Sequence, residues 1–363
     1  MFKTVELGEV LNYEQPTRYI VESDIYNDEY DVPVLTAGKS FILGYTNEKE
    51  NIYQNYPVII FDDFTTATKY VDFPFKVKSS AMKILSCDEN IADIKFLFYL
   101  IQTIKINSEQ HQRYWISKFS KIQIPLPSLV TQKAIAEKLD KADALRKKDQ
   151  ELLKQYDELA QSIFIDMFGD PVQNEKGWDV DFLSSVAPFK KYDGNVKEVS
   201  GKYWLLNLDM VKSNTGEIIS KNYVEKSEIT NSTVSFNEEQ VLYSKLRPYL
   251  NKVVLPNSSG YATSELVPMN PNKEVLNRIF LGYLLRSKSF VNYIEEKVAG
   301  AKMPRVNMDT LREYNVILPP FNLQNQFAEK IKNIEAQKEL VKKQAEASEN
   351  LFQALLQESF SFT

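Results

Sequence analysis

The sequence predicts an α+β protein, in which two mixed, strand-rich α/β domains are separated by a long antiparallel two-helix coiled coil with pseudo-twofold symmetry. The first observation behind this prediction is a repeat. IPLPSLVTQKAIAEKL from residue 124 aligns without a gap with VILPPFNLQNQFAEKI from residue 316, at an offset of 192 residues, and the match continues to Phe168 and Phe360. The second is the helical spacing of apolar residues inside each copy. The third is the rest of the chain, which consists of short runs rich in β-branched and aromatic residues.

The first domain is expected over residues 1–128. The runs VPVLTA, YPVIIFDDF and MKILS are bounded by turn residues and predict strands. One helix is expected in DIKFLFYLIQTI, which starts at Asp93. Its apolar residues would share one face, as an amphipathic helix requires: Phe96, Leu97, Leu100, Ile101 and Ile104.

The first long helix is expected over residues 129–168. No glycine or proline occurs from Thr131 to Phe168. Gly169 then supplies a left-handed cap and is followed by Asp170 and Pro171, which are typical of a helix end.

The second domain is expected over residues 169–320, again as short strands and turns, with one helix near Ile279 to Tyr293. The second long helix is expected over residues 321–363, regular from Leu323 to about Phe360. At a rise of 1.5 Å per residue, each long helix would be roughly 55 Å in length.

The apolar stripes of the two long helices predict that they pack on each other as a coiled coil. The alternative is that each helix lies on its own domain. Arg146 and Lys338 are equivalent by the offset of 192, and Asp149 lies one step further along. Polar seam residues of this kind fix register or orientation more than they add stability. The predicted seam consists of Ile135, Leu139, Ala142, Arg146, Leu153, Tyr156, Ala160, Ile163, Phe327, Ile331, Ile334, Lys338, Val341, Ala345, Phe352 and Leu355.

Composition sets broad limits. The chain has 363 residues, with 43% hydrophobic and 26% charged residues, as is ordinary for a globular protein of two domains. No apolar run reaches the length of a membrane span and no signal peptide is recognisable, so a cytoplasmic location is expected. A single cysteine, Cys87, and a single histidine, His111, exclude an internal disulfide and argue against a structural zinc site. The net charge of −5 argues mildly against a nucleic-acid partner.

Several stretches look catalytic without completing a site. Residues 37–40, AGKS, resemble the end of a phosphate-binding loop, but Pro33 stands where its first glycine belongs. Residues 318–321, LPPF, resemble the NPPY/F motif of amino-methyltransferases, but Leu318 replaces the asparagine. His111, in a polar run, is more typical of a surface residue than of a general base. No credible active site is predicted.

The segment from Leu126 to Pro171 resembles the central conserved region of the specificity subunits of Type I restriction-modification systems. The second copy resembles the distal conserved region of the same family. The shared pattern is LP, then Q-x(3)-AEK, then a long helix that ends QSIF-x-x-MFGDP in the first copy. The second copy lacks the GDP ending, and the resemblance covers the whole chain.

This resemblance implies a function. Residues 1–128 and 169–320 would be target-recognition domains, each reading one half of a bipartite, asymmetric sequence in double-stranded DNA. The helix pair would act as the ruler between the halves and would bind two methyltransferase subunits, through which restriction/motor subunits join. The resemblance places S-adenosylmethionine, ATP and magnesium in those partners. This chain would have no cofactor or metal of its own and would be non-catalytic.

Candidate DNA contacts are cations that neutralise phosphates and polar side chains that reach base edges. Lysines gather around Lys69, Lys76 and Lys78, and the polar runs 110–113 and 302–307 precede the last strand of each domain. The full set of candidates is Thr65, Thr66, Thr68, Lys69, Lys78, Gln110, His111, Gln112, Arg113, Lys245, Arg247, Tyr249, Lys252, Thr263, Ser264, Lys302, Arg305 and Asn307.

Two other hypotheses remain open at this point. A self-sufficient nuclease could use Asp62, Asp63, Asp93 and Lys95, in which case the chain alone would cleave DNA with magnesium. A helical scaffold that binds only proteins would not shift a random DNA duplex in a gel.

Overall fold

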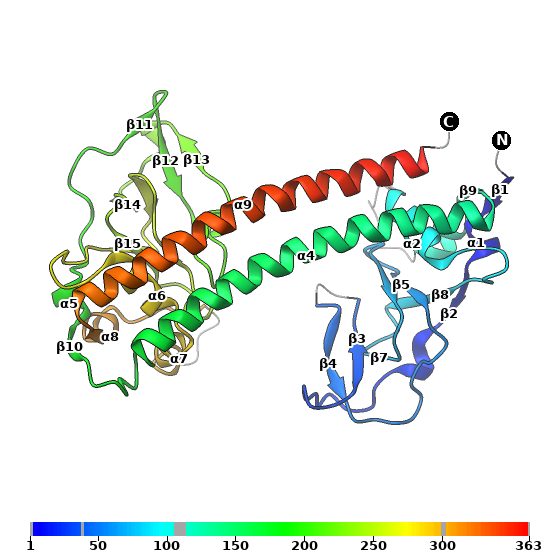
Figure 1. The fold of residues 1–363 in the computed structure, drawn as a ribbon, viewed down its shortest axis with the longest axis horizontal. Coiled ribbons are helices and arrows are strands. Elements are labelled where there is room, and N and C mark those ends of the chain that lie inside the picture. The colour runs from blue at the N-terminus through cyan, green and yellow to red at the C-terminus, as the bar shows by residue number, and fades with distance from the viewer. Residues whose placement is uncertain (1–2, 38–39, 105–113, 299–302, 362–363) are drawn as a thin grey trace. The chain divides into compact units, whose positions relative to one another are not determined.

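The computed structural model describes residues 3–37, 40–104, 114–298 and 303–361. The chain divides into two compact units. Unit 1 comprises Met1–Asp149 and Gln344–Thr363, and unit 2 comprises Gln150–Lys343. The division falls inside each long helix, so each unit contains one globular region and part of both helices (Figure 1). The predicted mixed class, with strand-rich sheets and long helices, is confirmed.

Unit 1 has its strands in small sheets. β1 (Lys3–Glu6) pairs antiparallel with β9 (Gln123–Leu126), directly before the long helix. One sheet has the order β2 (Asn12–Glu14), β8 (Met82–Ser86), β5 (Val58–Asp62), β6 (Thr68–Val71). Another has the order β4 (Ile42–Thr46), β3 (Val32–Leu35), β7 (Lys76–Val77), with β3 and β7 parallel. The three strands predicted from VPVLTA, YPVIIFDDF and MKILS are confirmed as β3, β5 and β8.

Short helices complete unit 1. α2 (Ile94–Thr103) begins where Asp93 accepts a hydrogen bond from the amide of Phe96 at 2.9 Å, as its sequence predicts. Its residues Phe96, Leu97, Leu100 and Ile101 are buried in the core beneath it, and Ile104 is half-buried. The remaining elements are α1 (Leu7–Val10), η1 (Pro16–Tyr19), α3 (Tyr114–Ser117) and η2 (Phe119–Lys121).

Unit 2 repeats this strand plan. β10 (Asp179–Phe182) pairs antiparallel with β19 (Asn315–Leu318), directly before the second long helix. One sheet has the order β11 (Glu198–Val199), β12 (Lys202–Leu206), β17 (Gly260–Thr263), β14 (Thr233–Phe236), with β13 (Asn222–Val224) also paired to β12. The other has the order β16 (Val253–Val254), β15 (Val241–Ser244), β18 (Leu266–Met269). The parallel pair β12·β17 corresponds to β3·β7, and β15 between β16 and β18 corresponds to β5 between β6 and β8.

The prediction of a single helix near residues 279–293 is wrong in detail. The chain forms α6 (Arg278–Arg286) and α7 (Lys288–Glu296), which are separated at Ser287. Ser287 adopts an extended backbone and its hydroxyl accepts a hydrogen bond from the amide of Phe290, so it caps a new helix. The short elements of unit 2 are α5 (Leu183–Val186), η3 (Leu208–Met210), η4 (Lys226–Glu228), η5 (Pro248–Leu250) and α8 (Met308–Arg312).

The long helices are α4 (Leu129–Phe168) and α9 (Phe321–Phe360), each of 40 residues and therefore about 60 Å long. α4 ends at the predicted cap, because Gly169 has a φ of +76° and its amide donates to the carbonyl of Ile165 at 2.8 Å. Among the described residues, no helix is long and apolar enough to cross a membrane.

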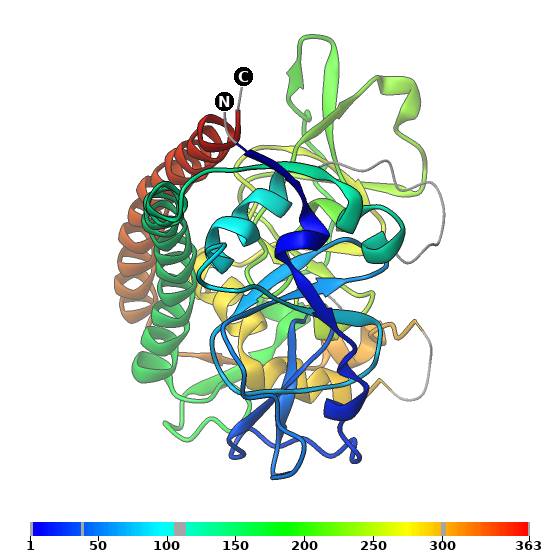
Figure 2. The ribbon, with the colours of Figure 1, turned by 90° about the vertical axis from the view of Figure 1, so that its right-hand side faces the viewer.

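Inside each unit, α4 and α9 lie side by side and run antiparallel (Figures 1 and 2). In unit 1, Leu139 and Ala142 of α4 share a buried cluster with Phe352 and Leu356 of α9. In unit 2, Asp157 of α4 accepts a hydrogen bond from Lys338 of α9 at 2.6 Å. Every residue of the predicted seam is buried or half-buried.

The long helices also pack on the globular part of their unit. In unit 2, the ring of Phe164 lies 5.5 Å from Phe280 of α6 and 5.6 Å from Phe327 of α9. Phe168 joins the same cluster, and these rings are fully buried. The aromatic cluster therefore joins both long helices to the domain.

The repeated glutamine of the sequence has the same structural role in both units. Gln132 is 1% exposed; it accepts from the amide of Asp93 and donates to the carbonyl of Pro127, both at 2.8 Å. Gln324 is 0% exposed and makes the same bonds, to the amide of Asn277 and the carbonyl of Pro319, also at 2.8 Å. Each glutamine thus ties the start of a long helix to the cap of the domain helix, α2 or α6.

Candidate nucleic-acid interface

Three segments that are distant in the sequence meet in unit 2. They are the loop after β15, the turn between β17 and β18, and the segment that leads into α8. The amide of Lys245 donates to the carbonyl of Glu265 at 3.0 Å, and the carbonyl of Lys245 accepts from Val306 at 2.8 Å. The amide of Arg247 donates to the carbonyl of Pro304 at 2.8 Å. The backbone therefore brings the candidates Lys245, Arg247 and Arg305 to one place, called here the unit 2 loop cluster.

Two of the three cations in the unit 2 loop cluster are arginines. Arg305 is exposed, and its Nη2 lies 2.8 Å from Oε1 of Glu265, which fixes the direction of the guanidinium. Arg247 adopts a left-handed backbone with a φ of 51°, and its Nε is buried without a hydrogen-bond partner among the described residues. Tyr249, two residues on, is 47% exposed. A guanidinium held in one direction suits contacts with phosphates and base edges.

The other candidates of unit 2 have different settings. Thr263, half-buried, pairs with Thr233 across the sheet, and Ser264 beside it is exposed. Asn307 is exposed and accepts from the amide of Asp309, so it caps α8. Lys252 binds the backbone, since its Nζ donates to the carbonyl of Leu208 at 2.6 Å, and burial lowers the pKa of its amine.

Unit 1 builds its corresponding loops on the same frame. The amide of Asp63 donates to the carbonyl of Ala81 at 3.3 Å, and the carbonyl of Asp63 accepts from Tyr114 at 3.1 Å. Asp63 therefore takes the backbone position that Lys245 takes in unit 2. Its side chain is buried, with Oδ1 accepting from the amide of Trp115 and Oδ2 lying 3.3 Å from Nζ of the buried Lys83. The frame is shared, but the side chains that it carries differ.

The candidates in the β5–β6 turn are held by Asp62. Its carboxylate accepts from the amides of Phe64 and Thr65 and from the hydroxyl of Thr65. Thr66 follows with a φ of 62°, and the half-buried Thr68 begins β6. The Asp62 carboxylate thus fixes the shape of this turn.

The lysines of unit 1 differ in accessibility. Lys69 is exposed, with Nζ 6.0 Å from the ring centroid of Phe41. Lys78 pairs with Asp24, whose carboxylate raises the pKa of the Lys78 amine through a hydrogen bond. Lys76, in contrast, is 2% exposed and binds Glu48 at 2.6 Å, so its predicted place in a positive surface is wrong. Gln110, His111, Gln112, Arg113 and Lys302 lie outside the described residues.

The residues of the nuclease hypothesis have structural roles that keep them apart. Asp62 holds a turn, Asp63 is buried with Lys83, Asp93 caps α2, and Lys95 binds Asp140 of α4 at 2.5 Å. Within the described ranges, no group of three or more His, Cys, Asp or Glu residues could hold a metal ion. The structure does not assemble the proposed nuclease site.

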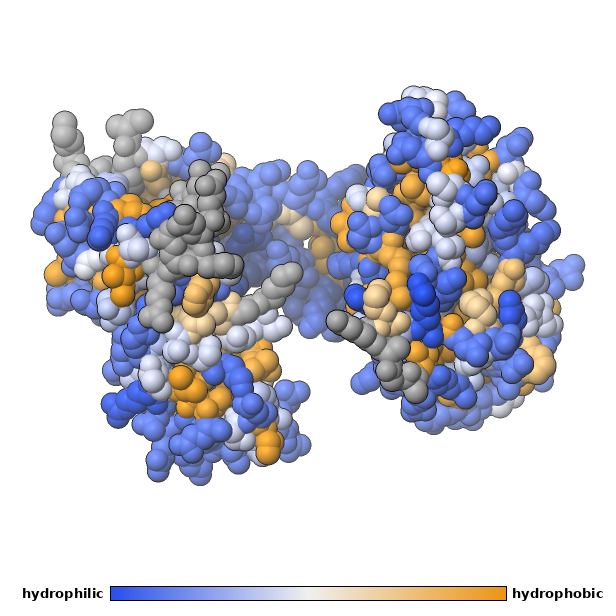
Figure 3. All heavy atoms as spheres, turned by 180° about the vertical axis from the view of Figure 1, so that it is seen from behind, coloured by the Kyte–Doolittle hydropathy of each residue, from blue (hydrophilic) through white to orange (hydrophobic). Residues whose placement is uncertain are grey.

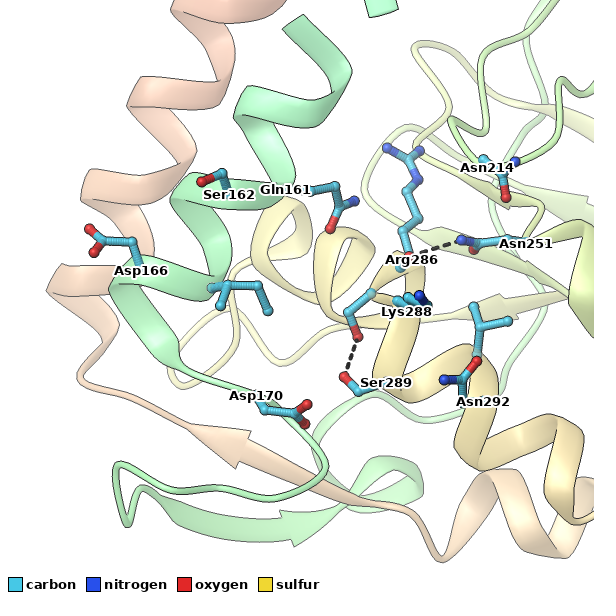
Figure 4. Close-up of a pocket in the computed structure, with 13 residues that line it drawn as sticks. Gln161, Ser162, Asp166, Asp170, Asn214, Asn251, Arg286, Lys288, Ser289 and Asn292 are labelled. Carbon is cyan, nitrogen blue, oxygen red and sulfur yellow. Dashed lines mark hydrogen bonds between the residues drawn. The ribbon is translucent and has the colours of Figure 1, made fainter. Parts of the chain in front are cut away.

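A cleft of about 850 Å³ lies in unit 2 beside the end of α4 and the start of α7 (Figure 4). Arg286 donates from Nε and Nη2 to the carbonyl of Val253, and Asn251 donates to the carbonyl of Arg286. Oδ1 of Asn251 is buried without a hydrogen-bond partner among the described residues. The hydroxyls of Ser287 and Ser289 lie 3.4 Å apart, and among the described residues that line the cleft none is a histidine that could activate them.

Some residues in these contacts were missed by reasoning from the sequence. Glu265 orients Arg305, and Asp143, Asp157 and Glu349 bind the polar seam residues Arg146 and Lys338. The seam partners had a signal, since acidic residues stand at 143 and 335 and at 157 and 349, pairs that are 192 apart. Glu265 had no such signal, because it lies 40 positions from Arg305 in the sequence and meets it only in the folded chain.

On the face seen in Figure 3, each unit is largely hydrophilic, with apolar side chains in scattered groups. Such a surface fits contact with a polar, hydrated partner better than insertion into an apolar one.

Comparisons of the sequence with known proteins identify one family. A family model described as a Type I restriction modification DNA specificity domain matches residues 1–155 and 175–349. The EcoR124I/EcoR124II specificity subunit of Escherichia coli is 52% identical over 151 residues, which are 38% of this chain and 37% of that protein. The EcoDI specificity subunit of Escherichia coli is 24% identical over 154 residues, which are 41% of this chain and 34% of that protein. The matched parts thus span little more than a third of the length of these relatives.

Solved structures support the same fold. The S subunit of a Type I restriction-modification system from M. genitalium has a TM-score of 0.58 at 14% identity, covering 100% of this chain and 97% of that one. A chain from a study of complex assembly and conformational transition of the Type I system has a TM-score of 0.50 at 17% identity, covering 99% and 97%.

Proposed function

Because the chain belongs to the Type I restriction-modification DNA specificity family, we propose that it selects the DNA sequence on which a Type I enzyme acts. Each unit reads one half of a bipartite, asymmetric target in double-stranded DNA. The globular parts, residues 1–128 and 169–320, are the target-recognition domains, and α4 and α9 form the coiled-coil ruler between the half-sites.

One observation carries this proposal: the two units hold different side chains on the same backbone frame. The position of Lys245 in the unit 2 loop cluster is occupied by the buried Asp63 in unit 1. Base pairs are distinguished by the donors and acceptors that meet them. Two similar frames with different side chains therefore suit two different half-sites.

The chain acts as an adaptor and is non-catalytic, as its family is. Adenine methylation would come from two methyltransferase subunits bound along the helices, and cleavage from restriction/motor subunits. The cofactors S-adenosylmethionine, ATP and magnesium belong to those partners.

The test is a map of methylated adenines in the genome of a restriction-deficient strain that carries this chain with its methyltransferase partner. We expect one asymmetric motif of two short half-sites at a fixed separation. A strain without the chain is the control. Methylation at a single continuous motif, or none that depends on this chain, would contradict the proposal.

The protein-only scaffold remains the second hypothesis. A gel shift of a duplex that contains the mapped motif, with and without the methyltransferase, separates the two. A scaffold would leave the sequence preference of the methyltransferase unchanged.

A further inference from the structure

Two cations of the helix seam, Arg146 and Lys338, each bind two acidic residues, and Lys147 also binds one of those acids, Asp143, at 2.8 Å. In unit 1, Arg146 of α4 binds Asp143 of its own helix at 2.5 Å and Glu349 of α9 at 3.3 Å. Its guanidinium also lies 4.2 Å from the ring centroid of Phe352. Asp143 is 8% exposed, whereas the side chains of Arg146 and Glu349 are 25% and 42% exposed, so the cluster is only partly removed from water.

Unit 2 contains the same arrangement with the helices exchanged. Lys338 of α9 binds Glu335 of its own helix at 3.0 Å and Asp157 of α4 at 2.6 Å. Lys338 is 7% exposed. In each cluster one cation binds an acid three residues earlier on the same helix and a second acid across the seam.

The two clusters are the two copies of one sequence pattern. Asp143 and Glu335, Arg146 and Lys338, and Asp157 and Glu349 all differ by 192 residues. The two contacts across the seam also share one register, because the residue numbers of Arg146 with Glu349, and of Asp157 with Lys338, both add up to 495.

Only this register gives both cations an acid across the seam. Sliding α9 by three residues one way would place Arg146 opposite Glu346, but Lys338 opposite Lys154. Sliding it by four residues the same way would place Ala345 opposite Arg146 and Leu153 opposite Lys338, so neither cation would face an acid. Sliding it the other way by three or four residues would offer no acid to either cation, since the facing residues would be Phe352 and Ala160, or Gln353 and Gln161.

The apolar stripes are less selective, because apolar residues recur every three or four positions and a slip by one turn sets them against each other again. Partly buried ion pairs contribute little net stability, yet a charge left unpaired at the same place is unfavourable. The clusters thus discriminate between registers that the apolar stripes would tolerate.

We propose that the Arg146–Glu349 and Lys338–Asp157 contacts determine how many base pairs separate the two half-sites, by locking the register of α4 against α9. This inference rests on the proposed function. A slip of three to four residues shifts the helices by about 4.5 to 6 Å along their axes. That distance equals about one to two base steps at 3.4 Å each.

The test uses Glu349→Gln with Asp157→Asn in the full chain. This double variant removes the acid that each of the two cations binds across the seam and leaves each cation its acid on the same helix. The contacts of Asp149 with Gln344 and Ser348 are retained. Adenine methylation is mapped in the genome of cells that carry the variant with its methyltransferase partner. We expect the ratio of sites with a separation altered by one or two base pairs to sites with the original separation to rise about tenfold.

Controls are available on the same helices. Glu137→Gln removes an exposed pair with Lys141 and should leave the separation unchanged. Arg146→Lys installs the cation that the equivalent position already carries and should also preserve the separation. If the double variant does not fold, as judged by helix content and melting temperature, each single variant retains one cluster and should show a smaller rise.

The outcomes are distinguishable. A folded variant, double or single, with an unaltered distribution of separations would overturn the register inference while a bipartite motif in the unmodified protein upholds the proposed function. Absence of any bipartite motif in the unmodified protein would remove the proposed function and this inference together.

Discussion

At the scale of single residues, the buried glutamines Gln132 and Gln324 explain why the repeat keeps this residue type. Each is the acceptor for the amide of a helix cap and the donor to a carbonyl just before the long helix. A carboxylate would lack the donor and an aliphatic residue would lack both. The sequence could indicate that the glutamine matters, because it occurs twice, but not its partner Asp93, which is 39 positions away.

Replacing Gln132 by Leu should therefore destabilise unit 1. The substitution leaves the amide of Asp93 and the carbonyl of Pro127 without their bonds, at about 1 to 3 kcal/mol for each buried group. Urea unfolding measures the loss. Gln155→Leu, at an exposed position of the same helix, is the control and should change the free energy of unfolding by less than about 0.5 kcal/mol.

Arg305 and Arg247 are the residues whose loss should weaken DNA binding most clearly. Replacing either by Ala should reduce the affinity for the mapped duplex by about 1 to 3 kcal/mol, and loss of a phosphate contact should reduce the salt slope by about 1. Titrations of the complex at several salt concentrations provide both numbers. Arg312→Ala, which removes an exposed arginine paired with Asp309, is the control. Unaltered binding by both variants would exclude these arginines from the site.

At the scale of elements, the aromatic cluster in unit 2 connects α4, α6 and α9. The ring of Phe327 lies 5.6 Å from that of Phe164 and 5.4 Å from those of Phe168 and Tyr283. The apolar period of the long helices predicted Phe327 as a buried residue, but not Phe164 and Phe168, because the predicted stripe considered only a partner helix and these rings face the domain.

Phe327→Ala should destabilise unit 2 by about 3 to 5 kcal/mol, since it removes a fully buried ring and leaves a cavity. Chemical denaturation followed by circular dichroism measures this. The control is Phe182→Ala in the same unit, where the ring is 51% exposed. Equal losses in the two variants would contradict the packing described.

The loop Lys212–Glu217, in the strand-rich part of unit 2, contacts α9 through an ion pair. Glu217 binds Lys342 at 2.6 Å, and Gly216 has a φ of +67° with the carbonyl of Val253 only 1.7 Å from where a Cβ would lie. Glycine is therefore required at this turn. Burial alone would raise the pKa of Glu217, but its hydrogen bond and charge interaction with Lys342 lower it below the ordinary 4.5.

The depressed pKa of Glu217 predicts a dependence on acid. A carboxyl group with a lower pKa in the folded than in the unfolded chain adds stability above its unfolded pKa, and this is lost as the pH falls through the folded pKa. The stability advantage over Glu217→Gln should therefore be largest above about pH 4.5 and shrink below it. Urea unfolding from pH 7 to 3 measures it, with exposed Glu274→Gln as the control. An advantage that does not vary with pH would refute the assignment.

At the scale of the whole molecule, the repeat and the period of the apolar residues were sufficient to predict two long helices and the mixed domains. Both signals are local along the chain. The order of the strands could not be predicted from the sequence. Partners such as β3 and β7 are about forty positions apart, and nothing between them specifies a parallel pair. The meeting of Lys245, Arg247 and Arg305 was unpredictable for the same reason.

Two target-recognition domains on one chain should bind a complete DNA target far more tightly than a duplex that contains only one half-site. Once one half-site is bound, the second binding event is intramolecular, so affinity should rise by about 10² to 10⁴ over a duplex with one half-site scrambled. Competition with such duplexes, in the presence of the methyltransferase partner, measures the ratio. Equal affinity for complete and half targets would show that only one unit reads DNA.

The antiparallel pairs β1·β9 and β10·β19 bring the entrance and the exit of each globular part to adjacent positions. Loops between those two strands that do not contact α4 or α9 can therefore change in length or in contacts without moving the long helices. Mutations in such loops can therefore change which bases a domain contacts, and a foreign segment can be inserted there. The separation of the two half-sites depends on the long helices and is not altered by such changes.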